Sequence, residues 1–132
     1  MTDQELLEQF ESGTLPSECF HHREHVRVAF LYLSHYPVLE ALQMFSNALR
    51  RFAAVHGKPQ LYHETITWAY IFLIRERVAR AGTRPSWDEF ASNNADLLTW
   101  KNGLVHDYYR QETLATDLAR AIFIFPDKFT QP

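Results

Sequence analysis

Apolar residues recur at spacings of three and four along most of this chain, which is the pattern of helices with a buried face. The strongest pattern runs over residues 20–36, where no glycine or proline occurs and the residues are apolar nearly all round. It predicts a helix in the middle of the molecule. Similar patterns predict helices over about 37–56 and 60–81, the second of which ends at Gly82.

Shorter helices are predicted on both sides of these three. Thr2 with Glu5, and Ser86 with Glu89, have the spacing of capping boxes, which mark the starts of a first and a fifth helix. A last helix is predicted from about residue 107 to residue 124. Because no stretch alternates as a strand would and no linker divides the chain, we expect an all-α fold. This fold is a compact single-domain bundle of about five to six helices over residues 1–132.

The composition narrows the classes of partner. A net charge of −3, with basic residues scattered among acidic ones, gives no reason to expect nucleic-acid binding. Cys19 is alone, so it has no partner for an intrachain disulfide, and the first residues lack the basic and then apolar pattern of a signal peptide. No apolar run approaches the ~20 residues of a membrane span. We therefore expect a cytoplasmic protein that binds neither nucleic acid nor membranes.

Histidines gather at the predicted starts of two long helices. His22 and His25 lie three residues apart, so they share one face of the second helix, and His63 with Glu64 opens the fourth. Short connections make successive helices antiparallel, so these first turns should lie at the same end of the bundle. The histidine and aspartate at 106–107 follow the fifth helix and arrive at that end too. The topology therefore predicts a histidine-lined polar pocket there.

One hypothesis for this pocket is a metal site. Imidazoles and carboxylates at this density suit a divalent transition metal such as zinc, iron or manganese. The ligands would be His22, His25 and His63, with Glu64 or His106 as a fourth. Glu64 is also the candidate catalytic residue, as a general base with or without the metal. The pattern favours an enzyme or a small-ligand-binding protein and does not decide between them.

A second hypothesis keeps the pocket and omits the metal. Two helix N-termini present free backbone N–H groups and positive dipole ends, so the pocket could hold a small anionic ligand with a carboxylate or phosphate group. The histidines would then donate hydrogen bonds or transfer protons. Further residues that the two hypotheses place at the pocket are Arg27, Thr67, Lys101, His106 and Asp107.

A third hypothesis is a non-catalytic interaction or structural module. Histidines near helix starts often donate to backbone carbonyls, so this hypothesis needs no ligand. Three aromatic residues near the end of the chain, Phe123, Phe125 and Phe129, would then bury against a second subunit and form a homodimer. The apolar second helix would contribute to the same interface.

Three motifs give the chain a resemblance to known proteins. They are F-x-H-x-x-H-V-R-x-A at 20–29, Y-H-E-T-x-T at 62–67 and A-R-x-x-F-x-x-P-D at 119–127. With these motifs the chain resembles a family of short bacterial helical proteins that has no assigned activity. The resemblance implies that the two histidine segments and the Ala-Arg segment are parts of the same site or structural unit. It makes Arg120 a candidate neighbour of the site or a buried partner for an acid.

Overall fold

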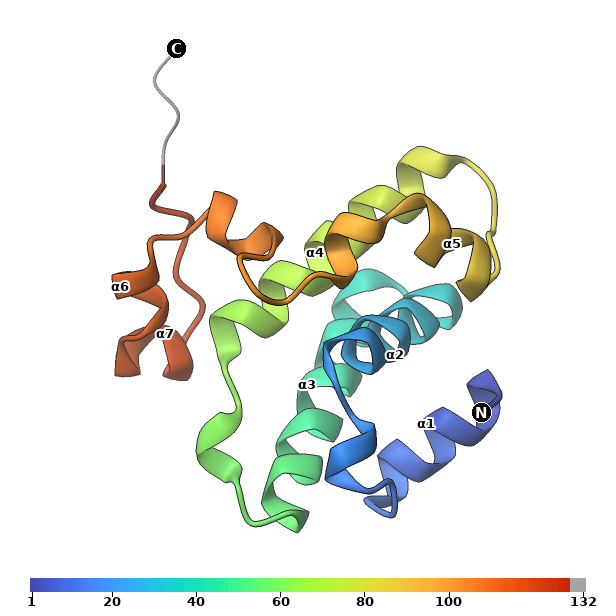
Figure 1. Cartoon of the computed structure of the whole chain (residues 1–132), viewed down its shortest axis with the longest axis horizontal. Helices are drawn as coiled ribbons and strands as arrows, with labels where there is room; N and C mark the ends of the chain where they lie inside the picture. The colour runs from blue at the N-terminus through green and yellow to red at the C-terminus, as the bar shows by residue number, and fades with distance from the viewer. Residues whose placement is uncertain (129–132) are drawn as a thin grey trace.

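The computed structural model describes residues 1–128, and within this range every regular element is helical (Figure 1). The α-helices are α1 (Asp3–Ser12), α2 (His22–His35), α3 (Val38–Val55), α4 (Glu64–Ala81), α5 (Trp87–Asn93), α6 (Gln111–Leu114) and α7 (Asp117–Ala121). Short 3₁₀ helices are η1 (Ser17–Cys19), η2 (Pro59–Leu61), η3 (Ala95–Leu98) and η4 (Leu104–Asp107). The prediction of an all-α bundle is confirmed.

Helices α2, α3 and α4 pack against one another and form the centre of the domain, with α1 and α5 against α2. Six residues of α2 are buried, and they are distributed round the helix rather than along one stripe: Val26, Val28, Ala29, Phe30, Leu31 and Tyr32. This confirms the central helix that the apolar pattern predicts. Burial of each large apolar side chain stabilises the fold by about 1.5–3 kcal/mol.

The helix starts follow the capping signals in the sequence. The Thr2 hydroxyl accepts from the Glu5 N–H at 3.1 Å, and the Glu5 carboxylate accepts from the Thr2 N–H at 3.4 Å, so the first capping box is complete. At α5 the Ser86 hydroxyl accepts from the Glu89 N–H at 3.2 Å. Gly82, at φ 70°, ends α4 in the left-handed conformation that glycine adopts without strain.

The prediction of one helix over 107–124 is wrong, because polar side chains there bind backbone groups that a continuous helix would use. The Thr116 hydroxyl caps α7 by accepting from the Ala119 N–H at 3.1 Å. The Asp127 carboxylate accepts from the Arg110 N–H at 3.1 Å and from the Thr113 hydroxyl. Threonine and aspartate compete with helical hydrogen bonds in this way, so the segment forms η4, α6 and α7 instead.

The C-terminal elements fold back over the first half of α4 (Figure 1). The buried Thr65 hydroxyl lies 2.7 Å from the Ala119 carbonyl oxygen and 2.8 Å from that of Ile122, to one of which it donates. It also accepts from the Ile124 N–H at 3.1 Å. The Trp68 and Phe123 rings stack with their centroids 5.1 Å apart. Thr65 and the Trp68–Phe123 pair therefore help to fix the segment to α4.

The structure describes one of the other two aromatic residues of the predicted dimer interface. Phe125 is 80% exposed and contacts Phe123 edge to face. Phe129 lies outside the described residues. None of the helices in the described range combines the length and apolar character needed to cross a membrane.

The replacement Thr65→Val is expected to lower the free energy of unfolding by about 1–3 kcal/mol, because it leaves buried backbone groups of the C-terminal segment without a partner. Thr67→Val is the matched control, since the Thr67 hydroxyl donates only to the His63 carbonyl oxygen one turn earlier. Thr67→Val should lower the free energy of unfolding by less than about 1 kcal/mol. Urea denaturation measures both values, and equal losses would contradict the assignment.

Candidate functional site

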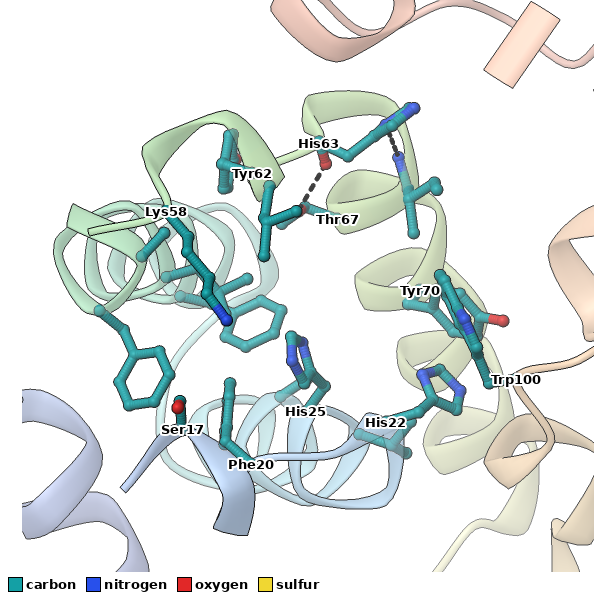
Figure 2. Close-up of a pocket in the computed structure, with 18 of the residues that line it drawn as sticks. Ser17, Phe20, His22, His25, Lys58, Tyr62, His63, Thr67, Tyr70 and Trp100 are labelled. Carbon is teal, nitrogen blue, oxygen red and sulfur yellow. Dashed lines mark hydrogen bonds between the residues drawn. The ribbon is translucent and has the colours of Figure 1, made fainter. Parts of the chain in front are cut away.

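A cavity of about 750 Å³ opens between α2, α3 and α4, with η1, η2 and the segment around Trp100 at its rim (Figure 2). It is the candidate functional site. Its polar lining residues are Ser17, Glu18, His22, His25, His56, Lys58, Tyr62, His63, Thr67, Tyr70 and Arg120. Its apolar lining residues are Phe20, Val26, Ala29, Phe45, Leu49, Phe52, Ala53, Leu61, Ile66, Ile74 and Trp100.

The deeper walls of the cavity are apolar rather than polar as the sequence led us to expect. Phe20, Phe45 and Phe52 are buried members of the hydrophobic core that also face the cavity. Two of these rings, Phe20 and Phe52, lie 4.7 Å apart between centroids. Most of a ligand in this space would therefore contact carbon atoms, with polar groups at a few positions.

His25 projects into the cavity from the first turn of α2 (Figure 2). Its ring stacks on Phe20 with the centroids 4.1 Å apart. Burial, together with the neighbouring histidines His22 and His21 when they are charged, lowers the pKa of His25 from 6.5 to about 3. The imidazole is therefore neutral at physiological pH, with one N–H donor and one acceptor nitrogen. Neither nitrogen forms a hydrogen bond with a side chain or backbone group of residues 1–128.

His22 lies on the same helix, but its ring is held by the opposite wall. Its Nε2 lies 2.8 Å from the Leu97 carbonyl oxygen, so this nitrogen carries the proton and donates. The ring packs against Tyr70 and Trp100, at centroid distances of 4.8 and 5.1 Å. Burial lowers the pKa of His22. The residue thus joins α2 to the segment after α5 while one edge still faces the cavity.

His63 has a structural role at the start of α4. Its Nδ1 accepts from the Ile66 N–H at 3.1 Å, and its Nε2 lies 2.8 Å from the Leu114 carbonyl oxygen, to which it donates. Both ring nitrogens are used, and the ring points away from His25 (Figure 2). Burial lowers the pKa of His63, which keeps Nδ1 available as the N-terminal cap of the helix.

The three histidines therefore line one cavity, as the topology predicts, without forming a ligand set. His63 uses both nitrogens in backbone contacts, and His22 uses one. Within residues 1–128, no three side chains of histidine, cysteine, aspartate or glutamate are grouped so that they could hold a metal ion. The expectation that His22, His25 and His63 converge on one point is corrected by this geometry.

Glu64, the predicted general base, lies behind the cavity wall. Its carboxylate accepts from the Tyr62 hydroxyl at 2.5 Å and forms an ion pair with Arg50 at 2.9 Å. The Tyr62 hydroxyl also lies 2.6 Å from the Ser46 hydroxyl. The Arg50 guanidinium sits over the Tyr62 ring, 4.7 Å from its centroid. This network fixes Tyr62 as a wall of the cavity, and Glu64 itself does not line it.

The remaining predicted pocket residues divide into two groups. Thr67 and Arg120 line the cavity, and the Arg120 guanidinium donates to the Gln60 carbonyl oxygen at 3.2 Å. Arg27 is outside it, since its guanidinium pairs with Asp3 at 2.6 Å. The others outside the lining are Lys101, His106 and Asp107. His106 and Asp107 form the end of η4, and the structure does not place them at this cavity.

Sequence reasoning missed several residues of the site, including Ser17 and Glu18 of η1. Lys58 reaches into the cavity from the turn between α3 and η2 (Figure 2). His56 also lines it, and its Nε2 lies 3.0 Å from the Leu15 carbonyl oxygen. Trp100 is 54% exposed at the rim. Lys58 and His56 could have been predicted from their position. Both lie in the connection that leads to His63, at the end of the bundle where the pocket was expected.

Comparisons with protein-family models, curated proteins and solved structures find no match for this chain. The resemblance of its three motifs to a bacterial family stays a prediction. Each of these motifs does contribute to the cavity: 20–29 supplies His22 and His25, 62–67 supplies Tyr62 and Thr67, and 119–127 supplies Arg120.

The replacement His25→Phe is expected to reduce the loss of stability at acidic pH. Below pH 6.5 the unfolded chain gains a proton at His25, whereas the folded protein gains it only near pH 3, so stability falls as the pH is lowered through this window. Removing the group should make the decrease between pH 7 and pH 4.5 smaller by about 2 kcal/mol. Urea denaturation at several pH values measures this effect.

The control for this experiment is His35→Phe, at an exposed position near the end of the same helix. It makes the same chemical change outside the cavity. If His25→Phe left the pH dependence of unfolding as it is in the unchanged protein, His25 would not be the buried neutral group described above.

Proposed function

We propose that the protein binds a small organic molecule with a mainly apolar body in the cavity between α2, α3 and α4. The observation that carries this proposal is the cavity itself: its volume of about 750 Å³ falls in the range of ligand sites, roughly 300–1,000 Å³. Such sites are lined mainly by apolar and aromatic side chains, with a small number of polar groups that orient the ligand. Half of the lining residues are polar by type, and the apolar deep walls described above fit this composition.

Binding is better supported than catalysis by the arrangement of the titratable groups. An acid/base histidine is usually oriented by a carboxylate or carbonyl on its second nitrogen. Among residues 1–128, no carboxylate pairs with His25. Glu64, the general base that the sequence predicted, is occupied by Tyr62 and Arg50. The neutral histidine therefore serves best as a hydrogen-bonding group for a bound molecule.

The replacement Ala53→Trp is expected to fill the cavity from α3 and weaken binding. Ala53 lines the cavity and is half-buried, whereas Ala54 beside it is exposed and outside the lining. The neutral dye N-phenyl-1-naphthylamine, which fluoresces strongly in apolar surroundings, is the probe. The unchanged protein and Ala54→Trp should bind it alike, and Ala53→Trp at least about tenfold more weakly, a change of about 1.4 kcal/mol.

Circular dichroism confirms that both variants keep their helices. The proposed function would be contradicted if the wild-type protein did not bind the dye. Equal binding by the two folded variants would contradict it as well, because the dye would then lie elsewhere on the protein.

A further inference from the structure

Two nitrogen-bearing side chains of the cavity lining have no hydrogen-bond or ion-pair partner among residues 1–128. Lys58 extends its amine into the space from one side, and His25 presents its ring from the other, so the two side chains face the same volume (Figure 2). Within residues 1–128, Lys58 makes no ion pair with an acid. The neutral His25 ring has an N–H available because it makes no hydrogen bond there.

Several other polar groups of the wall already have partners, whereas the buried Tyr70 hydroxyl has none among residues 1–128. The Tyr62 hydroxyl donates to Glu64, and the Thr67 hydroxyl donates to the His63 carbonyl oxygen. His22 donates its Nε2 proton to the Leu97 carbonyl oxygen. Lys58 is exposed and His25 is half-buried, and both offer unpaired N–H groups to a ligand that enters this cavity.

The charge at the cavity favours an anion. Lys58 and Arg120 are the two permanent cations of its lining, and Glu18 on η1 is its only acid within the described residues. His22, His25 and His63 are uncharged at neutral pH, since burial lowers their pKa values. The lining therefore carries one net positive charge on exposed side chains, which attracts an anion toward the mouth of the cavity.

We propose that the ligand of this cavity is a monocarboxylic acid, with its carboxylate held by the Lys58 Nζ and the His25 N–H and its apolar body among Phe20, Phe45 and Phe52. This inference rests on the function proposed above and adds the chemical class of the ligand. A lysine gives a carboxylate a charge-assisted hydrogen bond, and the imidazole N–H supplies a second donor. The aromatic rings then exclude water from the body of the molecule.

A phosphate group fits the site less well than a carboxylate. Phosphates in proteins are commonly bound by the free N–H groups of a helix N-terminus or by the fork of an arginine. At α4 the Ile66 N–H is already bound by His63, and the Arg120 guanidinium already binds the Gln60 carbonyl oxygen. A doubly charged group would also exceed the single positive charge of the lining and cost more to desolvate.

Pairs of molecules that differ only in the charged group test this inference. Decanoate is compared with decan-1-ol, and 4-phenylbutyrate with 4-phenylbutan-1-ol, by calorimetry and by the fluorescence of Trp100 at the rim. The acid of at least one pair should bind the unchanged protein about tenfold or more tightly than its alcohol, as expected for a charge-assisted contact in a partly apolar site.

Lys58→Met removes the cation and keeps most of the side-chain length. It should weaken acid binding at least about tenfold and change alcohol binding by less than about twofold. His25→Phe keeps the stack on Phe20 and removes the N–H, so it should weaken acid binding in the same direction. Lys101→Met, at an exposed position outside the lining, is the control and should bind both molecules like the unchanged protein.

The outcomes separate the two proposals. If acid and alcohol bind equally well, or if Lys58→Met binds the acid like the unchanged protein, the carboxylate assignment is overturned and the apolar site remains. If the unchanged protein binds neither member of any pair nor the neutral dye, the proposed function itself is overturned. If decyl phosphate binds more tightly than decanoate, the carboxylate assignment is overturned and the head group of the ligand is assigned as a phosphate.

Discussion

The burial of α2 on every side is the constraint on which the rest of the structure depends. A helix that is apolar all round must be covered by several neighbours, and α1, α3, α4 and α5 supply this cover. The cover is complete along the middle of α2 and incomplete at its first turn, where the cavity opens. His22 and His25 lie in that turn, so the packing that stabilises the fold also places two neutral imidazoles beside an enclosed space.

The apolar pattern predicted the large helices because their faces are decided by burial. Residues 20–36, 37–56 and 60–81 gave α2, α3 and α4, with the last shortened because His63 caps it. The region after residue 107 could not be predicted in this way. Its apolar residues have a helical spacing, but Thr116 and Asp127 satisfy backbone groups locally and break the helix. Periodicity identifies the buried face and does not show where a side chain competes with the backbone.

The candidate site was predicted in position and only partly in composition. Topology brought the starts of α2 and α4 to one cavity, but a residue's place on a helix does not fix its rotamer. His63 illustrates this, because its ring turns back to cap its own helix and bind Leu114. Lys58 was missed because it belongs to a turn, where no repeating pattern marks which side chains point inward. The apolar character of the deep walls followed from core residues that sequence reasoning assigned to packing alone.

The double contact of His63 has a consequence for the dynamics of the domain. One imidazole joins the first turn of α4 to the carbonyl of Leu114, and Thr65 two residues later joins the same turn to the backbone around Ile122. Local opening of either segment would break polar contacts of the other, so the two form a single cooperative unit. Arg120 belongs to that unit, so the part of the cavity wall that it supplies should open together with the first turn of α4 rather than as a separate flap.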